Sequence, residues 1–163
     1  MQLGDQFHLG IVTAGLAATM DALTSVFGYE WGPEVGGPTT VRLPSGDAVL
    51  DLRCAFSTSV PRLELVRSIP GTLWEPAPGG IHHVGFWSDD VAADTAELAG
   101  NGYVLEAGRN GPDGRPFFTF QRSATGFRIE LVSTAARAGL EQCWASPAQR
   151  TAPAQRTAET DRP

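Results

Sequence analysis

The second half of this chain repeats its first half, and this constrains the fold more than any other feature of the sequence. Phe7–Thr13 aligns with His82–Ser88 at an offset of 75 residues (83 − 8), so that His8 falls on His83. A glycine recurs two positions after each of these histidines. Self-similarity of this kind is typical of a chain built from repeated structural units. We therefore expect two halves with the same order of elements.

The two halves also end alike. Arg62–Val66 (RLELV) aligns with Arg128–Val132 (RIELV), so that Glu64 falls on Glu130 at an offset of 66 residues (130 − 64). The smaller offset indicates that the second half has a shorter middle. The similarity thus covers the first and the last segment of each half.

Each half reads as one strand, one helix and three strands. Residues 7–13 are rich in β-branched and aromatic side chains, as in a strand, and the apolar residues of 15–27 recur at helical spacing. Gly28 is suited to end that helix. Gly108–Gly114 is expected to be a flexible loop, and Ser88 or Asp89 to cap the second helix. The expected elements are strands at 7–13, 38–44, 47–55, 61–67, 82–88, 103–107, 116–122 and 127–133, and helices at 15–27 and 90–100.

The sequence therefore predicts an α+β fold, in which tandem βαβββ modules form a cup-shaped mixed β-sheet with flanking helices. A single domain would span residues 1–136, with module one at about 5–68 and module two at about 80–134. Residues 137–163 would add a short helical turn, Ala138–Trp144, and a disordered tail. The tail is expected from Ser146 on, because no large apolar residue follows it.

Composition excludes several classes of function. The chain is 42% hydrophobic and 18% charged, as in a soluble globular protein. Its 12 basic and 18 acidic residues give a net charge of −6, which argues against a nucleic-acid or acidic-membrane partner. All the basic residues are arginines, so a lysine Schiff base and a P-loop lysine are excluded.

The cysteines and the apolar segments indicate a cytoplasmic protein. Cys54 and Cys143 are too few for a disulfide framework or a thiolate zinc site, and we expect both to be reduced thiols. No apolar run approaches the ~20 residues that a membrane span needs. The first residues carry no secretory signal.

Four residues at equivalent positions of the repeat form a candidate metal site: His8, Glu64, His83 and Glu130. Each histidine lies in the first strand of its half and each glutamate in the last. If those strands are neighbours, alternation of side chains can direct both residues to one face. Two imidazoles and two carboxylates suit zinc or a divalent first-row transition metal.

Each residue taken alone has a simpler interpretation. A single histidine among apolar residues is usually a structural one, and a glutamate between aliphatic residues can face solvent on a surface strand. The agreement of all four positions with the repeat favours the metal site. His82 is expected to face away from His83 by alternation, and to support the site or the structure rather than act as a ligand.

With these residues, the chain resembles the vicinal oxygen chelate superfamily, which includes glyoxalase I, methylmalonyl-CoA epimerase, extradiol dioxygenases and bleomycin-resistance proteins. The resemblance runs over about residues 5–134 and rests on the four candidate ligands, on Gly28-Tyr29 and on Gly80–Phe86 (GIHHVGF). The last segment is most similar to the glyoxalase and epimerase branch.

The resemblance implies a metal-dependent isomerase or lyase. In such enzymes a divalent ion (Zn, Ni, Co, Mn or Fe) holds two oxygens of a small molecule, and a proton moves at the carbon next to a carbonyl. Glu64 or Glu130 would be the catalytic base. Methylmalonyl-CoA epimerases usually have glutamine where Glu64 stands, whereas bacterial glyoxalase I is more similar to this set. Ring-cleaving dioxygenases of the superfamily hold iron with two histidines and one glutamate. Glu64 would add a fourth ligand and crowd such a site, so this activity is less favoured.

A second class of function stays open, namely a small-molecule binding or resistance protein for an antibiotic or a toxic metabolite. Relatives of that kind generally lack the metal set. The candidate substrate-binding residues are Trp74, Trp87, Arg53 and Phe120, although such aromatic residues more often pack in a core. The resemblance and the exposed strand edges favour a homodimer.

Overall fold

A computed structural model describes residues 2–145 of the chain. Its strands and helices follow the order βαβββ twice, as the repeat predicts. The expected disordered tail from Ser146 on lies outside the described residues. The elements are η1 Leu3–Asp5, β1 Gln6–Thr13, α1 Leu16–Phe27, β2 Val35–Leu43, β3 Gly46–Phe56, β4 Leu63–Arg67, β5 His83–Ser88, α2 Val91–Gly100, β6 Val104–Asn110, β7 Pro116–Arg122, β8 Arg128–Ser133, η2 Thr134–Ala136 and α3 Arg137–Ala145.

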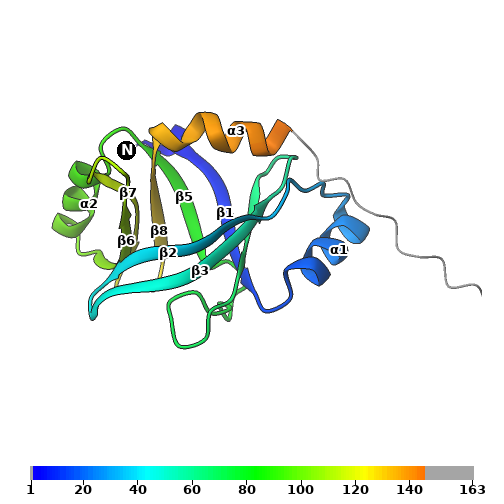
Figure 1. The fold of residues 1–163 in the computed structure, drawn as a ribbon, viewed down its shortest axis with the longest axis horizontal. Coiled ribbons are helices and arrows are strands. Elements are labelled where there is room, and N and C mark those ends of the chain that lie inside the picture. The colour runs from blue at the N-terminus through cyan, green and yellow to red at the C-terminus, as the bar shows by residue number, and fades with distance from the viewer. Residues whose placement is uncertain (1, 146–163) are drawn as a thin grey trace, which may run out of the picture.

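The eight strands form one closed barrel in the order β1-β4-β3-β2-β6-β7-β8-β5, shaped as a cup (Figure 1). The first and last strands of each module are parallel neighbours, β1 with β4 and β5 with β8. The modules join where β1 pairs with β5 in antiparallel fashion. They meet again where β2 pairs with β6 at Arg42 and Gly108. The predicted mixed α+β fold with a curled sheet is thus confirmed.

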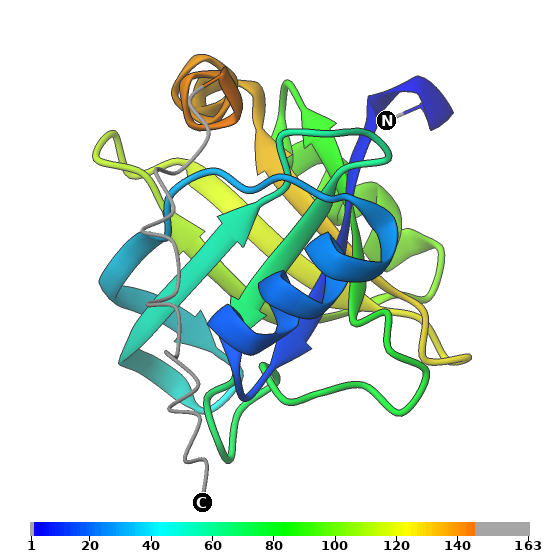
Figure 2. The ribbon, with the colours of Figure 1, turned by 90° about the vertical axis from the view of Figure 1, so that its right-hand side faces the viewer.

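The helices α1 and α2 pack on the outside of the barrel (Figures 1 and 2). The apolar face of α1, including Leu16, packs against the outward side chains of β4, Leu63 and Leu65. In module two, Val91 and Leu98 of α2 pack in the same way against Ile129 and Leu131 of β8. These contacts bury the outward face of each last strand, so the residues between the aliphatic ones face inward.

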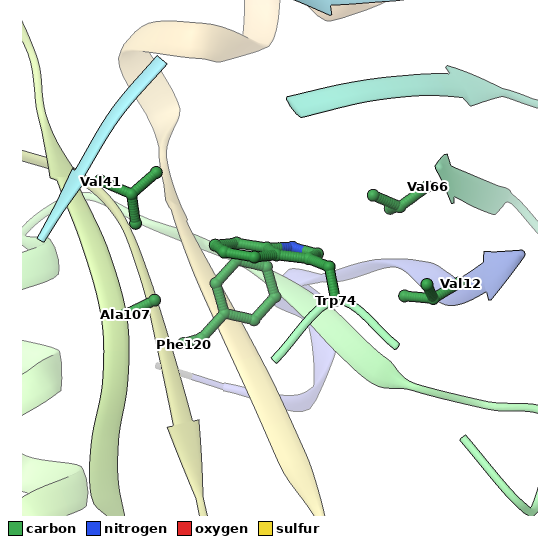
Figure 3. Packing of buried hydrophobic residues seen from close by; sticks show 6 residues of the cluster. All are labelled: Val12, Val41, Val66, Trp74, Ala107 and Phe120. Atoms are coloured by element: carbon green, nitrogen blue, oxygen red, sulfur yellow. The ribbon is translucent and has the colours of Figure 1, made fainter. Parts of the chain in front are cut away.

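The inside of the barrel is filled at one end by a separate apolar cluster (Figure 3). Trp74 is its largest member, 2% exposed, and its ring meets that of Phe120 edge to face, with 5.6 Å between centroids. The cluster consists of Val12, Val41, Val66, Trp74, Ala107 and Phe120. Three of its members, Val66, Trp74 and Phe120, also line a cavity in the interior.

The structure corrects three local expectations. Asp90, rather than Ser88 or Asp89, caps α2, because its carboxylate accepts a hydrogen bond from the Ala93 N–H at 3.0 Å. The expected loop at 108–114 is shorter, since β6 stays paired with β7 as far as Asn110. The expected helical turn near the C-terminal end is the nine-residue helix α3, which begins one residue earlier, at Arg137.

In the described part of the chain, no helix has the length and apolar character needed to cross a membrane.

Candidate metal centre

The strand register directs the two glutamates into the barrel. In the β1–β4 ladder Gly10 lies opposite Glu64, and in the β5–β8 ladder Gly85 lies opposite Glu130. Both glutamates are buried, at 7% and 8% exposure, while their aliphatic neighbours pack outward under the helices. The interpretation in which the glutamates face solvent on a surface strand is therefore wrong.

Two glycines make room for the two histidines. Between β1 and β5, His8 lies opposite Gly85 and Gly10 lies opposite His83. A Cβ atom at Gly10 would lie 1.9 Å from Cε1 of the His83 ring, and one at Gly85 would lie 1.9 Å from Cε1 of the His8 ring. Each imidazole thus lies against the backbone of the other module, in space that a side chain at Gly10 or Gly85 would otherwise occupy. This explains why a glycine follows each histidine by two residues.

The four side chains meet in the interior, with one donor atom of each within 4.8 Å of all the others. The Nε2 atoms of His8 and His83 are 3.0 Å apart, and His83 Nε2 is 3.0 Å from Glu64 Oε2. The other three measured distances between a histidine Nε2 and a glutamate Oε2 are 3.2–3.4 Å. Both histidines are 1–2% exposed. Two nitrogen and two oxygen donors therefore converge on one buried point.

This donor set fits a divalent cation. Zinc-type bonds to nitrogen and oxygen are about 2.0–2.2 Å long, which places neighbouring ligand atoms roughly 3.0 Å apart at right angles and roughly 3.4 Å apart at tetrahedral angles. The measured separations of 3.0–3.4 Å lie in that interval. Two ionised carboxylates and two neutral imidazoles carry two negative charges, which a divalent ion balances.

A chain of hydrogen bonds orients the His83 ring. His82 Nε2 lies 2.7 Å from the carbonyl oxygen of Leu73, which can only accept, so this nitrogen carries the proton. His82 Nδ1 is then the acceptor for the N–H of His83 Nδ1, 2.9 Å away. When the His83 ring is neutral, its lone pair is therefore on Nε2, which faces the cluster. The expectation that His82 faces away from His83 is wrong, because the two rings are in contact.

The carboxylates control the pKa values of the histidines. Burial by itself lowers the pKa of His8, but hydrogen bonds and charges of Glu130 and Glu64 outweigh this and raise it to about 9. The same opposing causes raise the pKa of His83. At Glu64, where burial alone would raise the pKa, the two histidines lower it well below its usual range. In the absence of a cation the cluster therefore holds protons, which a metal ion would have to displace.

The cluster opens into a cavity of about 470 Å³ inside the cup. His8, Glu64 and Glu130 line it together with a largely apolar wall. Three of the four candidate substrate-binding residues, Arg53, Trp74 and Phe120, also line it. A volume of this size is typical of sites for small organic ligands, which are mostly apolar with a few convergent polar groups.

Trp87 and Arg53 differ in their surroundings from the other two candidate substrate-binding residues. Trp87 does not lie among the residues that line this cavity; it stacks on Phe7 with 3.8 Å between ring centroids and lines a second, acidic cavity. Arg53 lines the main cavity but already pairs with Asp51 at 3.0 Å and with Glu34 at 3.8 Å.

Sequence reasoning missed other residues that line the cavity. Arg109 lies in the stretch expected to be a loop, and Leu140 and Cys143 lie in α3, where only a docking turn was expected. Cys54 was interpreted only as a reduced thiol, and it also lines the cavity. Burial and the neighbouring Glu64 raise the pKa of its thiol, which keeps it protonated. The alternation of β3 offered the one available signal, because Cys54 shares a face with the buried Phe56.

The comparison with protein families agrees with this geometry. Residues 7–120 match the model of the Glyoxalase/Bleomycin resistance protein/Dioxygenase superfamily. No curated protein sequence is significantly similar to the chain.

Solved structures share the fold at low sequence identity. A methylmalonyl-CoA epimerase variant from Streptomyces coelicolor, in complex with 2-nitronate-propionyl-CoA, is 23% identical with a TM-score of 0.56, covering 81% of this chain and 98% of that one. The methylmalonyl-CoA epimerase from Mycobacterium tuberculosis is 19% identical with a TM-score of 0.53, covering 83% of this chain and 91% of that one. These similarities show the fold.

Proposed function

This chain belongs to the Glyoxalase/Bleomycin resistance protein/Dioxygenase superfamily, and we propose that it is a metal-dependent isomerase or lyase of the epimerase and glyoxalase type. The observation that carries the proposal is the buried cluster of His8, Glu64, His83 and Glu130 at the wall of an apolar cavity. The reaction would be the transfer of a proton at the carbon next to a carbonyl group of a small molecule.

We propose His8, Glu64, His83 and Glu130 as the residues that hold the cation. When bound there, a divalent cation would act as a Lewis acid toward two substrate oxygens and stabilise the negative charge that develops as the carbon loses its proton. The two histidines, fixed by burial and, for His83, by the hydrogen bond to His82, would keep their Nε2 atoms directed at the same point.

The two carboxylates are the candidates for moving the proton. Glu64 comes from module one and Glu130 from module two, and each presents its Oε2 atom to the cluster. A carboxylate in a water-poor site becomes a stronger base than one in water. We propose that one carboxylate removes the proton from the substrate carbon, and that a carboxylate returns it to the same or the neighbouring carbon. The buried apolar wall would exclude water and so limit exchange of that proton.

The substrate is proposed from the relatives and from the cavity. The S. coelicolor epimerase variant is in complex with 2-nitronate-propionyl-CoA, and a second epimerase structure is in complex with methylmalonyl-CoA. Bacterial glyoxalase I, which the His-Glu-His-Glu set resembles more closely, isomerises a hemithioacetal. The substrates of both kinds of enzyme are carbonyl compounds with a second oxygen donor and an acidic C–H bond. Thioesters of this kind and hemithioacetals are therefore the first compounds to test.

The metal site is tested first. Protein purified without chelators and loaded with Co²⁺ or Ni²⁺ is expected to hold about one ion per chain, measured by elemental analysis. His8→Ala and Glu130→Gln are expected to lose it, whereas the matched variant Glu97→Gln, on the exposed face of α2, should keep it. Unchanged metal content in the first two variants would show that the ligand assignment is wrong.

The reaction is tested by isotope exchange. The loaded protein in D₂O is expected to introduce deuterium next to the carbonyl of a methylmalonyl thioester, a 2-oxo acid or a hemithioacetal, detected by NMR. Glu64→Gln and Glu130→Gln should each slow exchange by at least about 100-fold, the lower range for loss of an acid–base group, with Glu97→Gln as the control. Binding of these compounds without exchange would instead favour the small-molecule binding protein.

The homodimer and the cytoplasmic location stay predictions. The exposed strand edges expected to favour a dimer are not present among the described strands, because all eight close into a barrel. Sedimentation of the full chain tests the first and cell fractionation the second.

A further inference from the structure

The helix α3 lies across one end of the barrel (Figure 1), and its residues Leu140 and Cys143 line the same cavity as three residues of the metal cluster. It follows β8 of module two through η2, and its far end reaches module one. There the carbonyl oxygen of Cys143 lies so close to Gly32 that a Cβ atom at Gly32 would be 2.6 Å from it. The helix thus spans the mouth of the barrel from one module to the other.

A single large side chain attaches the far end of α3. The guanidinium of Arg62 lies 3.8 Å from the centroid of the Trp144 ring, and Phe56 meets the same ring at 6.2 Å. Trp144 also lies near Trp87 of module two, with 6.3 Å between centroids. No residue of α3, Trp144 included, is fully buried. Its position is therefore set by contacts at its ends, and its inner side faces the cavity.

The inner side of α3 is left open at Gly139. Gly139 and Leu140 both line the cavity of about 470 Å³. A Cβ atom built on Gly139 meets no atom within 4 Å. Glycine inside a helix costs about 1 kcal/mol relative to alanine, so nothing in the local helix requires it here. Gly139 is exposed to solvent and also lines the cavity, so a side chain added there would take up space at the cavity's opening.

We propose that α3 is the roof of the substrate cavity, and that Gly139 and Leu140 limit the apolar substituent that a metal-chelating substrate can carry. The ligand class is a compound with two neighbouring oxygen donors at one end and an aliphatic or aryl group at the other. The assignment of the oxygen-donor end rests on the proposed function. The helix lies outside residues 7–120, which match the superfamily model.

Alkyl hydroxamates of increasing length test the roof, because their two oxygens chelate a metal and their chain probes the space beyond it. In the full-length protein loaded with Co²⁺, affinity measured by calorimetry is expected to rise with chain length from acetohydroxamate to decanohydroxamate, by at most about fourfold per methylene. Gly139→Leu should bind acetohydroxamate as the parent does and decanohydroxamate at least tenfold more weakly. The matched control is Ala138→Leu, since Ala138 is exposed like Gly139 but does not line the cavity.

A second probe needs no metal. The apolar fluorophore anilinonaphthalene sulfonate should bind the metal-free parent and Ala138→Leu alike, and Gly139→Leu at least severalfold more weakly. If the two leucine variants behave alike with both probes, the roof is refuted. If no hydroxamate binds to the loaded parent while the fluorophore still distinguishes the variants, the roof stands and the chelating function fails. Gly139→Leu raises helix propensity, so loss of folding is not the expected cause of a weaker signal.

Discussion

Replacing Gly10 by alanine should remove His83 from the cluster while leaving the barrel folded. The new Cβ atom would lie 1.9 Å from Cε1 and 2.3 Å from Nδ1 and Nε2 of the His83 ring. Carbon atoms in ordinary contact are about 3.5–4.0 Å apart, so the ring would have to move by at least about 1.6 Å. Metal–ligand distances tolerate only about 0.2 Å. The ring therefore cannot keep its place as a ligand.

In Gly10→Ala, the expected loss of metal affinity is large and the expected loss of stability is small, so the two effects can be told apart. Loss of a hydrogen bond that supports a ligand weakens metal affinity by about 10–100-fold, and loss of the ligand itself should cost at least about 100-fold. The free energy of unfolding of the metal-free protein should fall by about 1–3 kcal/mol, the usual effect of overpacking. By the same geometry Gly85→Ala should displace His8. Gly79→Ala is the control, because a Cβ atom at Gly79 meets nothing within 4 Å.

The assay is a calorimetric titration with Co²⁺ or Ni²⁺, together with the melting temperature in the presence and absence of the ion. An ion present at 100 times its dissociation constant stabilises the parent by about 2.7 kcal/mol, and Gly10→Ala should lose most of this effect. Binding of the ion to Gly10→Ala with the affinity and stoichiometry of the parent would refute the steric argument.

Three further predictions concern the surroundings of the cluster. His82→Phe removes the acceptor of the His83 N–H and should weaken metal affinity by about 10–100-fold, measured by the same titration. Burial favours a higher pKa for Glu106, but Arg128 and a second arginine outweigh this and lower it. The ionised Glu106 carboxylate therefore stabilises the folded protein above about pH 4.5, and this contribution is lost as the pH falls. Glu106→Gln should therefore lower the free energy of unfolding at pH 7 by about 1 kcal/mol, and by less at pH 3, in denaturant titrations. Because the pKa of His8 is raised from 6.5 to about 9, its stabilisation of the metal-free protein is complete below about pH 6.5 and is lost as the pH rises through 9. The melting temperature of the metal-free protein should fall over this interval more than that of the loaded protein, and equal slopes would contradict this.

The position of the glutamates shows how much a local pattern can predict. The alternation in RLELV and RIELV places Glu64 and Glu130 on the face opposite their aliphatic neighbours, but does not say which face is outside. Only the packing of α1 and α2 on the aliphatic face decides that both glutamates point into the barrel.

Sequence by itself determined the order of elements, the tandem βαβββ modules and the equivalence of His8 with His83 and of Glu64 with Glu130. A duplicated unit keeps its strand positions, so its periodicity and its equivalent residues can be read along the chain. Tertiary structure alone decided that each histidine lies against a glycine of the other module, that His82 contacts His83, that Trp87 does not line the main cavity and that α3 does. Apart from the contact between the adjacent residues His82 and His83, these features join segments that are remote in sequence or that follow the repeat. The His82 ring is held by the carbonyl of Leu73, so all of them depend on tertiary packing, which no local pattern encodes.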